Sequence, residues 1–94
     1  MSKASKIIDK MFLNDPFSLW LGIKRIEEKE GAVVLELTVR EEMLNGFGIA
    51  HGGITYSLAD SALAFSANGY GIQSVSIETS ISHTKPVKLG DVLR

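Results

Sequence analysis

The stretch from Ile54 to Asn68 is the part of this 94-residue chain that most constrains its fold. Its sequence, ITYSLADSALAFSAN, places alanine, serine, leucine and aromatic side chains on every face of a helix. A helix that is apolar all round is normally buried all round. We therefore expect a central helix around which the other elements wrap closely. Asn68 and Gly69 tolerate a left-handed backbone and predict the end of that helix.

Two alternating segments predict an antiparallel sheet beside this helix. A less regular strand from Leu19 to Glu28, a turn at Glu30-Gly31 and a second strand form a predicted hairpin. Ser74 to His83 alternates in the same way and predicts a third strand that ends before Pro86. Period-two alternation is typical of strands with one buried face. In the second strand the inward residues are Val33, Leu35, Leu37 and Val39.

The two ends of the chain complete the predicted order of elements. Ser5 to Asn14 reads as a short amphipathic helix, and Leu89-Gly90-Asp91 reads as a turn into a fourth strand that barely begins. The class is α+β, with an antiparallel sheet wrapped around one long helix. Three main strands are too few to enclose such a helix. We expect residues 1–94 to form a single domain that lacks its C-terminal strands or is covered by partner subunits.

Composition excludes several functions. Apolar residues make up 45% of the chain and charged residues 22%, a composition typical of globular proteins. The net charge is −1 and no basic run exceeds two residues, so we expect no nucleic-acid partner. The absence of cysteine excludes disulfides and thiol chemistry. Without an apolar leader or a bilayer-length apolar run, the chain is expected to be soluble, cytoplasmic and free of membrane contact.

Asp60 is the anomalous residue of the predicted central helix. It is the only charged residue between His51 and Lys85 apart from Glu78, and its neighbours are apolar. Burial would raise the pKa of its carboxyl towards values useful for a general base. A structural aspartate that hydrogen-bonds a nearby hydroxyl, such as Ser57, Ser61 or Tyr56, explains the residue equally well. The residue type alone leaves both interpretations open.

The segment before the helix offers a second chemical feature. Gly52-Gly53 lies where the first helical N–H groups lack internal partners, a suitable place for a developing oxyanion. A Gly-Gly pair more often means only a tight turn. His51 could donate a hydrogen bond, take a proton or cap the loop, and Asn45-Gly46 indicates a turn. A lone histidine without further ligands does not predict a metal site.

Taken together, these residues resemble the PaaI group of hot-dog-fold thioesterases. The similarity runs from Met43-Leu44-Asn45-Gly46 through His51-Gly52-Gly53 to Leu58-Ala59-Asp60-Ser61-Ala62, and it extends over essentially the whole chain. The resemblance implies a homodimer, often paired into a tetramer, that hydrolyses acyl-coenzyme A thioesters without a cofactor beyond the substrate's own coenzyme A. It further implies that the helix carboxylate works across the dimer interface.

The resemblance also assigns roles to single residues. Asp60 would activate water or attack the thioester, and the amide of Gly52 or Gly53 would polarise the carbonyl. Asn45 would position the carboxylate or water, with assistance from His51. Asn14 matches a position near the acyl pocket. Lys85 and Lys88 could meet the coenzyme A phosphates, although lysines at a strand end more often only aid solubility.

The acyl group is not encoded in a recognisable motif. The family's expectation is an aryl substrate of the phenylacetyl type, as in phenylacetate degradation, with a pocket formed by aromatic residues. Two other functions remain open: a hot-dog dehydratase or hydratase, and a non-catalytic acyl-CoA-binding module. The spacing typical of the dehydratases is absent. The candidate aromatic residues, each equally suited to plain core packing, are Phe12, Phe17, Trp20, Phe47 and Phe65.

Overall fold

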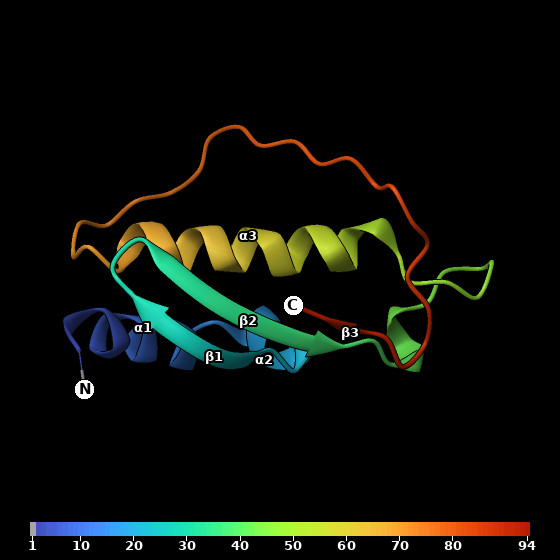
Figure 1. Cartoon of the computed structure of the whole chain (residues 1–94), viewed down its shortest axis with the longest axis horizontal. Coiled ribbons are helices and arrows are strands. Elements are labelled where there is room, and N and C mark those ends of the chain that lie inside the picture. Colours follow the sequence, from blue (N-terminus) through green and yellow to red (C-terminus); the bar gives the residue numbers. More distant parts are fainter. Residues whose placement is uncertain (1) are drawn as a thin grey trace.

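A computed structural model describes residues 2–94 as a small α+β fold built on one long helix (Figure 1). The long helix runs along the length of the molecule, with the β-hairpin against one side of it. The elements in chain order are α1 (Lys3–Leu13), α2 (Pro16–Leu21), β1 (Lys24–Lys29), β2 (Ala32–Thr38), the 3-10 helix η1 (Glu41–Met43), α3 (Gly52–Asn68) and β3 (Val92–Leu93).

The sheet is antiparallel with the order β1-β2-β3. Gly31 takes a positive φ of 77° in the hairpin turn, which favours glycine there. The alternation predicted for the second strand is confirmed, since Leu35, Leu37 and Val39 are buried and pack towards α3. The predicted turn at residues 89–91 is also confirmed, and it leads into β3, which pairs with the end of β2.

The predicted start of the first strand is wrong. Residues 16–21 form the short helix α2, and β1 begins only at Lys24. The local signals explain the helix: the Asp15 side chain accepts a hydrogen bond from the Ser18 amide at 3.0 Å, and Pro16 occupies the first turn. Gly22 ends the helix in a left-handed conformation. These capping signals outweigh the apolar residues that suggested a strand.

An arginine on β1 fastens α1 to the sheet. Arg25 lies 2.7 Å from the Asp9 carboxylate of α1, and it pairs with Glu28 on its own strand. Its guanidinium also lies 5.6 Å from the centroid of the Phe12 ring. The hydrogen bond with Glu28 is the largest cause that raises the pKa of Arg25. The contacts hold α1 in place beside the end of α3.

The long helix is confirmed, but its burial on every face is wrong. Its buried residues, Ile54, Leu58, Phe65 and Asn68, form one stripe that faces the sheet and α1. The opposite side exposes Ala59, Asp60 and Leu63. A three-stranded sheet covers only one side of a helix, so the remaining faces stay accessible in the single chain.

The third strand predicted for residues 74–83 is also not formed. The segment is extended and exposed, and it arches over the side of α3 that lies away from the hairpin (Figure 1). Its apolar residues Val75 and Ile77 are 83% and 98% exposed. A strand exists only where a neighbour completes its hydrogen-bond ladder, and no described strand lies beside this segment.

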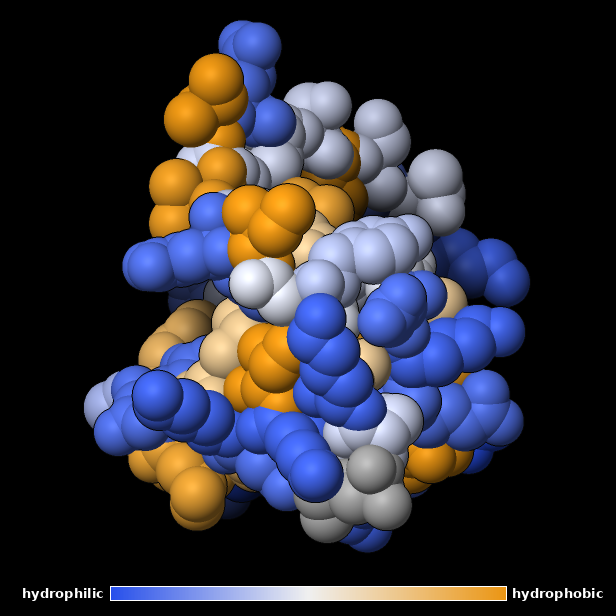
Figure 2. Space-filling view, turned by 90° about the vertical axis from the view of Figure 1, so that its left-hand side faces the viewer, coloured by the Kyte–Doolittle hydropathy of each residue, from blue (hydrophilic) through white to orange (hydrophobic). Residues whose placement is uncertain are grey.

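The end of the molecule at the left of Figure 1 is mainly hydrophilic. Hydrophilic side chains cover most of that end, and hydrophobic atoms emerge in separate areas between them (Figure 2). Tyr70 lies at this end and packs its ring against Gly31 of the hairpin turn. A Cβ at Gly31 would collide with the Tyr70 hydroxyl oxygen, so this glycine provides room for the tyrosine.

Candidate active site

The start of α3 presents two free backbone amides. His51 caps the helix through its backbone, since its carbonyl accepts from the Ile54 amide at 2.9 Å, while its side chain makes no capping bond. Within residues 2–94 the amides of Gly52 and Gly53 donate to no partner. Both glycines are exposed. The helix dipole adds positive potential here, so an oxygen that gains negative charge would be stabilised at this point.

A cavity of about 380 Å³ opens at this helix start. Gly52 lies against the ring of His83, because a Cβ added there would come within 2.9 Å of Nε2. The Thr55 hydroxyl donates to the Gly52 carbonyl at 2.9 Å, and its oxygen lies 3.4 Å from His83 Nδ1. Sequence reasoning missed His83, because its approach to Gly52 depends on the path of residues 74–83 over the helix (Figure 1).

Asn45 and Lys85 also line this cavity, together with His51. The Asn45 side-chain oxygen accepts from the amides of Phe47 at 2.9 Å and Ile49 at 3.4 Å, so it stabilises its own loop. Its Nδ2 group donates to no residue in the described part of the chain. The structure therefore brings three predicted site residues together at the start of α3, beside the two glycines.

Two other predicted binding residues lie elsewhere. Asn14 caps the end of α1, where its side-chain amide donates to the Lys10 carbonyl at 2.9 Å. It lines none of the cavities described here. Lys88 is exposed in the turn before β3, where its backbone amide donates to the Asp91 carboxylate at 2.9 Å. Both observed contacts are local and structural.

Asp60 is exposed in the single chain, which corrects the expectation of a desolvated carboxylate. The cause is the open face of α3, because the sheet covers only the opposite stripe. Two of the three proposed structural partners are hydrogen-bonded elsewhere: Ser61 pairs with Ser18 at 2.8 Å, and the Tyr56 hydroxyl pairs with Thr79. Within residues 2–94 the Asp60 carboxylate forms no hydrogen bond or ion pair. No structural role for this acid is visible.

Asp60 nevertheless lines two cavities, one on each side of its position on the helix. The smaller, of about 450 Å³, also reaches Gly53, and it contains the hydroxyls of Tyr56 and Thr79. Gly53 and Asp60 are seven residues apart, so they lie about 10 Å apart along the helix axis. In a single chain the Asp60 carboxylate and the free amides are therefore too far apart to act on the carbon and the oxygen of one carbonyl group.

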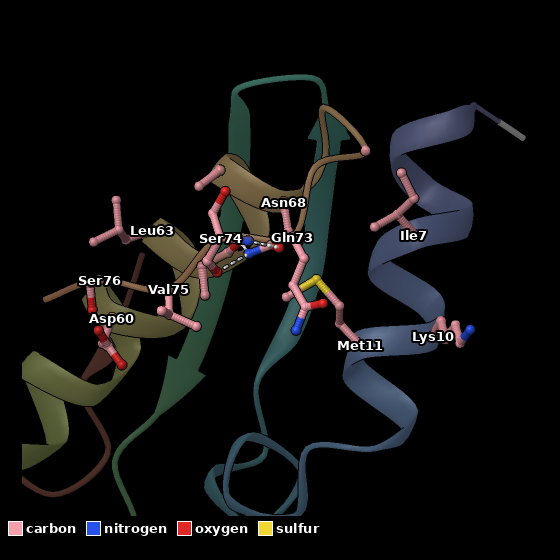
Figure 3. Close-up of a pocket in the computed structure, with 13 residues that line it drawn as sticks. Ile7, Lys10, Met11, Asp60, Leu63, Asn68, Gln73, Ser74, Val75 and Ser76 are labelled. Atoms are coloured by element: carbon pink, nitrogen blue, oxygen red, sulfur yellow. Dashed lines mark hydrogen bonds between the residues drawn. The ribbon is translucent and has the colours of Figure 1, made fainter.

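The larger cavity, of about 810 Å³, lies between α1, α3 and the segment after α3 (Figure 3). Asp60 and Ser76 lie at one end of it, and Ile7 and Met11 of α1 form its far side. Sequence reasoning missed Ser76, because a serine on an alternating segment normally indicates only an exposed strand face. The Asp60 carboxylate thus lies at the edge of a mainly apolar cavity.

No helix within residues 2–94 is both long and apolar enough to cross a bilayer. No group of three or more histidine, aspartate or glutamate side chains in the same residues is arranged to hold a metal ion.

Comparison with known proteins gives consistent matches. Residues 47–94 match the model of the thioesterase superfamily. The acyl-coenzyme A thioesterase PaaI of Escherichia coli is 38% identical over 91 residues, which are 97% of this chain and 65% of that protein. A putative esterase of Archaeoglobus fulgidus is 38% identical over 88 residues, or 94% of this chain and 57% of the relative. The chain thus spans less than two thirds of the length of these relatives.

Solved structures agree with the sequence matches. The structure of E. coli PaaI superposes with a TM-score of 0.92, covering 96% of this chain and 65% of that one. A hypothetical thioesterase from Streptococcus pneumoniae, solved with coenzyme A, is 31% identical with a TM-score of 0.79. That match covers 88% of this chain and 65% of the other.

Proposed function

Because this chain belongs to the thioesterase superfamily and has the hot-dog fold, we propose that the protein hydrolyses acyl-coenzyme A thioesters. The observation that carries the proposal is the Asp60 carboxylate, which lies on the central helix, lines two cavities and has no structural partner within residues 2–94. The names of the relatives support the substrate class, since E. coli PaaI is an acyl-coenzyme A thioesterase.

The chemistry needs only a base and an oxyanion site. Asp60 takes a proton from a water molecule whose oxygen adds to the thioester carbonyl carbon, or it attacks that carbon directly to give an anhydride that water then hydrolyses. The carbonyl oxygen gains negative charge, which the Gly52 or Gly53 amide stabilises. The carbon–sulfur bond breaks, and the proton passes to the departing coenzyme A sulfur. His51 and Asn45 orient the water and carbonyl at the same loop.

Two copies of the chain are needed for this arrangement. The free amides and Asp60 of one α3 lie about 10 Å apart along the axis, which is too far for both to act on one carbonyl group. An antiparallel second copy of α3 brings its own helix start to Asp60, and the first helix returns the contact by symmetry. We therefore propose a homodimer with two equivalent sites, which can pair into a tetramer.

Coenzyme A itself is held near the helix start in this proposal. Lys85 lines the cavity at Gly52, and Lys88 follows three residues later on the exposed surface. Both ammonium groups suit the phosphates of the coenzyme as point charges. The coenzyme A complex of the S. pneumoniae protein supports the same ligand class. Replacing Lys85 by alanine is expected to raise KM a few-fold without a change in kcat, measured by thiol release.

A pair of glycine substitutions tests the helix start. Gly52→Ala places a Cβ 2.9 Å from His83 Nε2, whereas Gly46→Ala, in the loop before the helix, meets nothing within 4 Å. We expect kcat/KM to fall about ten- to a hundredfold in the first variant, because the added Cβ obstructs the approach of the thioester carbonyl to the Gly52 amide. Gly46→Ala should stay within about twofold, because Gly46 is exposed and lies outside the cavity at the helix start.

The comparison is measured by thiol release, with unfolding midpoints to confirm that both variants fold. Equal losses of kcat/KM in the two variants would contradict a role in catalysis for the close approach between Gly52 and His83. If the protein binds acyl-CoAs but releases thiol from none of them, it is a binding module and not an enzyme.

A further inference from the structure

We infer that the groove between α1 and α3 receives the acyl chain of the substrate and selects straight, medium-chain aliphatic groups over aryl groups. The inference rests on the proposed thioesterase function and names its substrate class. The groove is the cavity of about 810 Å³ that begins at Asp60, so an acyl chain whose carbonyl is attacked there would enter it directly (Figure 3).

The walls of this groove are aliphatic. One wall is a stripe on α3, where Leu63, Ala64 and Ala67 follow Asp60 at helical spacing. The opposite wall is Ile7 and Met11 of α1. The alanines keep α3 narrow on this side, and a flexible methionine adapts to a mobile chain. Such a surface binds an acyl chain more tightly with each methylene group that it buries, but it has no feature that would orient an aromatic ring.

The aromatic residues expected to line an acyl pocket lie outside this groove. Phe12 and Phe65 pack against each other edge to face, with ring centroids 6.1 Å apart, as part of the apolar interior. Phe17 stacks on Trp20 of α2, with ring centroids 6.2 Å apart, and it lines the smaller Asp60 cavity rather than the groove. Phe47 is 92% exposed in its loop. No aromatic residue lines the groove, so an aryl group would find no ring to stack on.

The length and the far end of the groove limit the substrate further. Ala67 lies seven residues beyond Asp60, which corresponds to about 10 Å along the helix and matches an extended medium-length chain. Asn68 closes the far end: it donates to the Ala64 and Ser74 carbonyls, both at 2.9 Å, and accepts from the Ser74 amide at 2.8 Å. Its amide is therefore fully used and offers nothing to a polar chain end.

The position of Lys10 gives no reason to expect an acyl chain that ends in a carboxylate. It belongs to the lining of the groove, but its ammonium group points away from Asp60 and the other α3 residues in Figure 3. A terminal carboxylate on the acyl chain would thus meet the paired Asn68, the neutral Gln73 and the aliphatic walls, and no cation there would offset the cost of burying its charge (Figure 3). A plain hydrocarbon chain fits the groove better than a dicarboxylic one.

The test compares acyl-CoAs from acetyl to dodecanoyl, with phenylacetyl-CoA, on the full protein and three variants. For the wild type we expect kcat/KM to rise about fourfold per methylene up to medium length and then level off. Phenylacetyl-CoA should be at least about tenfold poorer than octanoyl-CoA. Ala67→Leu should lower the value for decanoyl-CoA at least about tenfold and leave butyryl-CoA within about twofold.

Two variants on α1 complete the test. One should shift the chain-length preference in the direction opposite to Ala67→Leu, and the other is a matched control. Ile7→Ala widens the groove and should move the optimum to longer chains. Leu13→Ala removes a similar side chain from the same helix, but Leu13 is 75% exposed and outside the groove, so the chain-length profile should not change. A uniform loss over all chain lengths in Ala67→Leu, or a preference for phenylacetyl-CoA, would overturn the inference.

Binding of S-alkyl-CoA thioethers separates this inference from the proposed hydrolysis, because these ligands lack the carbonyl group. If the protein hydrolyses acyl-CoAs but binds all thioethers equally, the groove assignment is wrong and the enzyme assignment stands. If it hydrolyses none, but thioether affinity rises with length and falls in Ala67→Leu, the groove assignment stands and the enzyme assignment is wrong.

Discussion

Asp60→Asn is expected to lower kcat for acyl-CoA hydrolysis by about a hundred- to ten-thousandfold, the range that a positioned general base contributes. The substitution keeps the size of the side chain and removes the charge that accepts the proton. The carboxylate makes no hydrogen bond or ion pair within residues 2–94, so the folded structure should lose little stability. KM should change only a few-fold, because Asp60 acts on the reacting carbon and water rather than on coenzyme A.

A matched acid on the surface controls for charge alone. Glu30 lies exposed in the hairpin turn and lines neither of the two cavities that contain Asp60. Glu30→Gln removes the same charge and should retain the wild-type kcat. Thiol release is measured at saturating acyl-CoA, with the unfolding midpoint of each variant alongside. Equal kcat values for wild type and Asp60→Asn would end the assignment of Asp60 as base or nucleophile.

The largest effect on stability is expected at Phe65. Its side chain is 1% exposed and packs edge to face with Phe12, so it joins α3 to α1 within the hydrophobic core. Phe65→Ala removes that contact and leaves a cavity where the helices meet. The free energy of unfolding should fall by about 3–5 kcal/mol. A loosened α1 would also widen the acyl groove, since Ile7 and Met11 belong to the same helix.

Phe47 provides the control for this change. It is 92% exposed in the loop before α3, so Phe47→Ala should alter the free energy of unfolding by no more than about 0.5 kcal/mol. Urea unfolding followed by circular dichroism measures both variants. Similar values for Phe65→Ala and Phe47→Ala would contradict the described core.

The fold was predictable where a pattern is local. The alternation around Leu35 and Leu37 and the long helical stretch of α3 depend on residues close in sequence, and both are confirmed. The apolar pattern places the start of the first strand too early, because a cap and a proline make residues 16–21 helical and outweigh that pattern. The strand predicted for residues 74–83 is not formed for a different reason. Its hydrogen-bond ladder needs a neighbouring strand, and a local pattern does not show whether one is present.

The candidate site was predictable only in part. Asn45, His51 and Gly52 meet at the start of α3 because they belong to one loop. The exposure of Asp60 was not predictable from its apolar neighbours, since it depends on how much of α3 the sheet covers. His83 packs against Gly52 from 31 residues later in the chain, and Ser76 reaches the Asp60 cavity in the same way. Contacts of this kind depend on chain paths that residue types do not encode.

Co-expression of two differently tagged, impaired variants tests the central claim most directly. In a mixed dimer of Asp60→Asn and Gly52→Ala, one site combines an intact carboxylate with an intact helix start, while the other site carries both defects. Random pairing makes half of the dimers mixed, so the co-expressed protein should recover about a quarter of wild-type activity. Activity no higher than the mean of the two variants measured separately would contradict a site shared between two copies of α3.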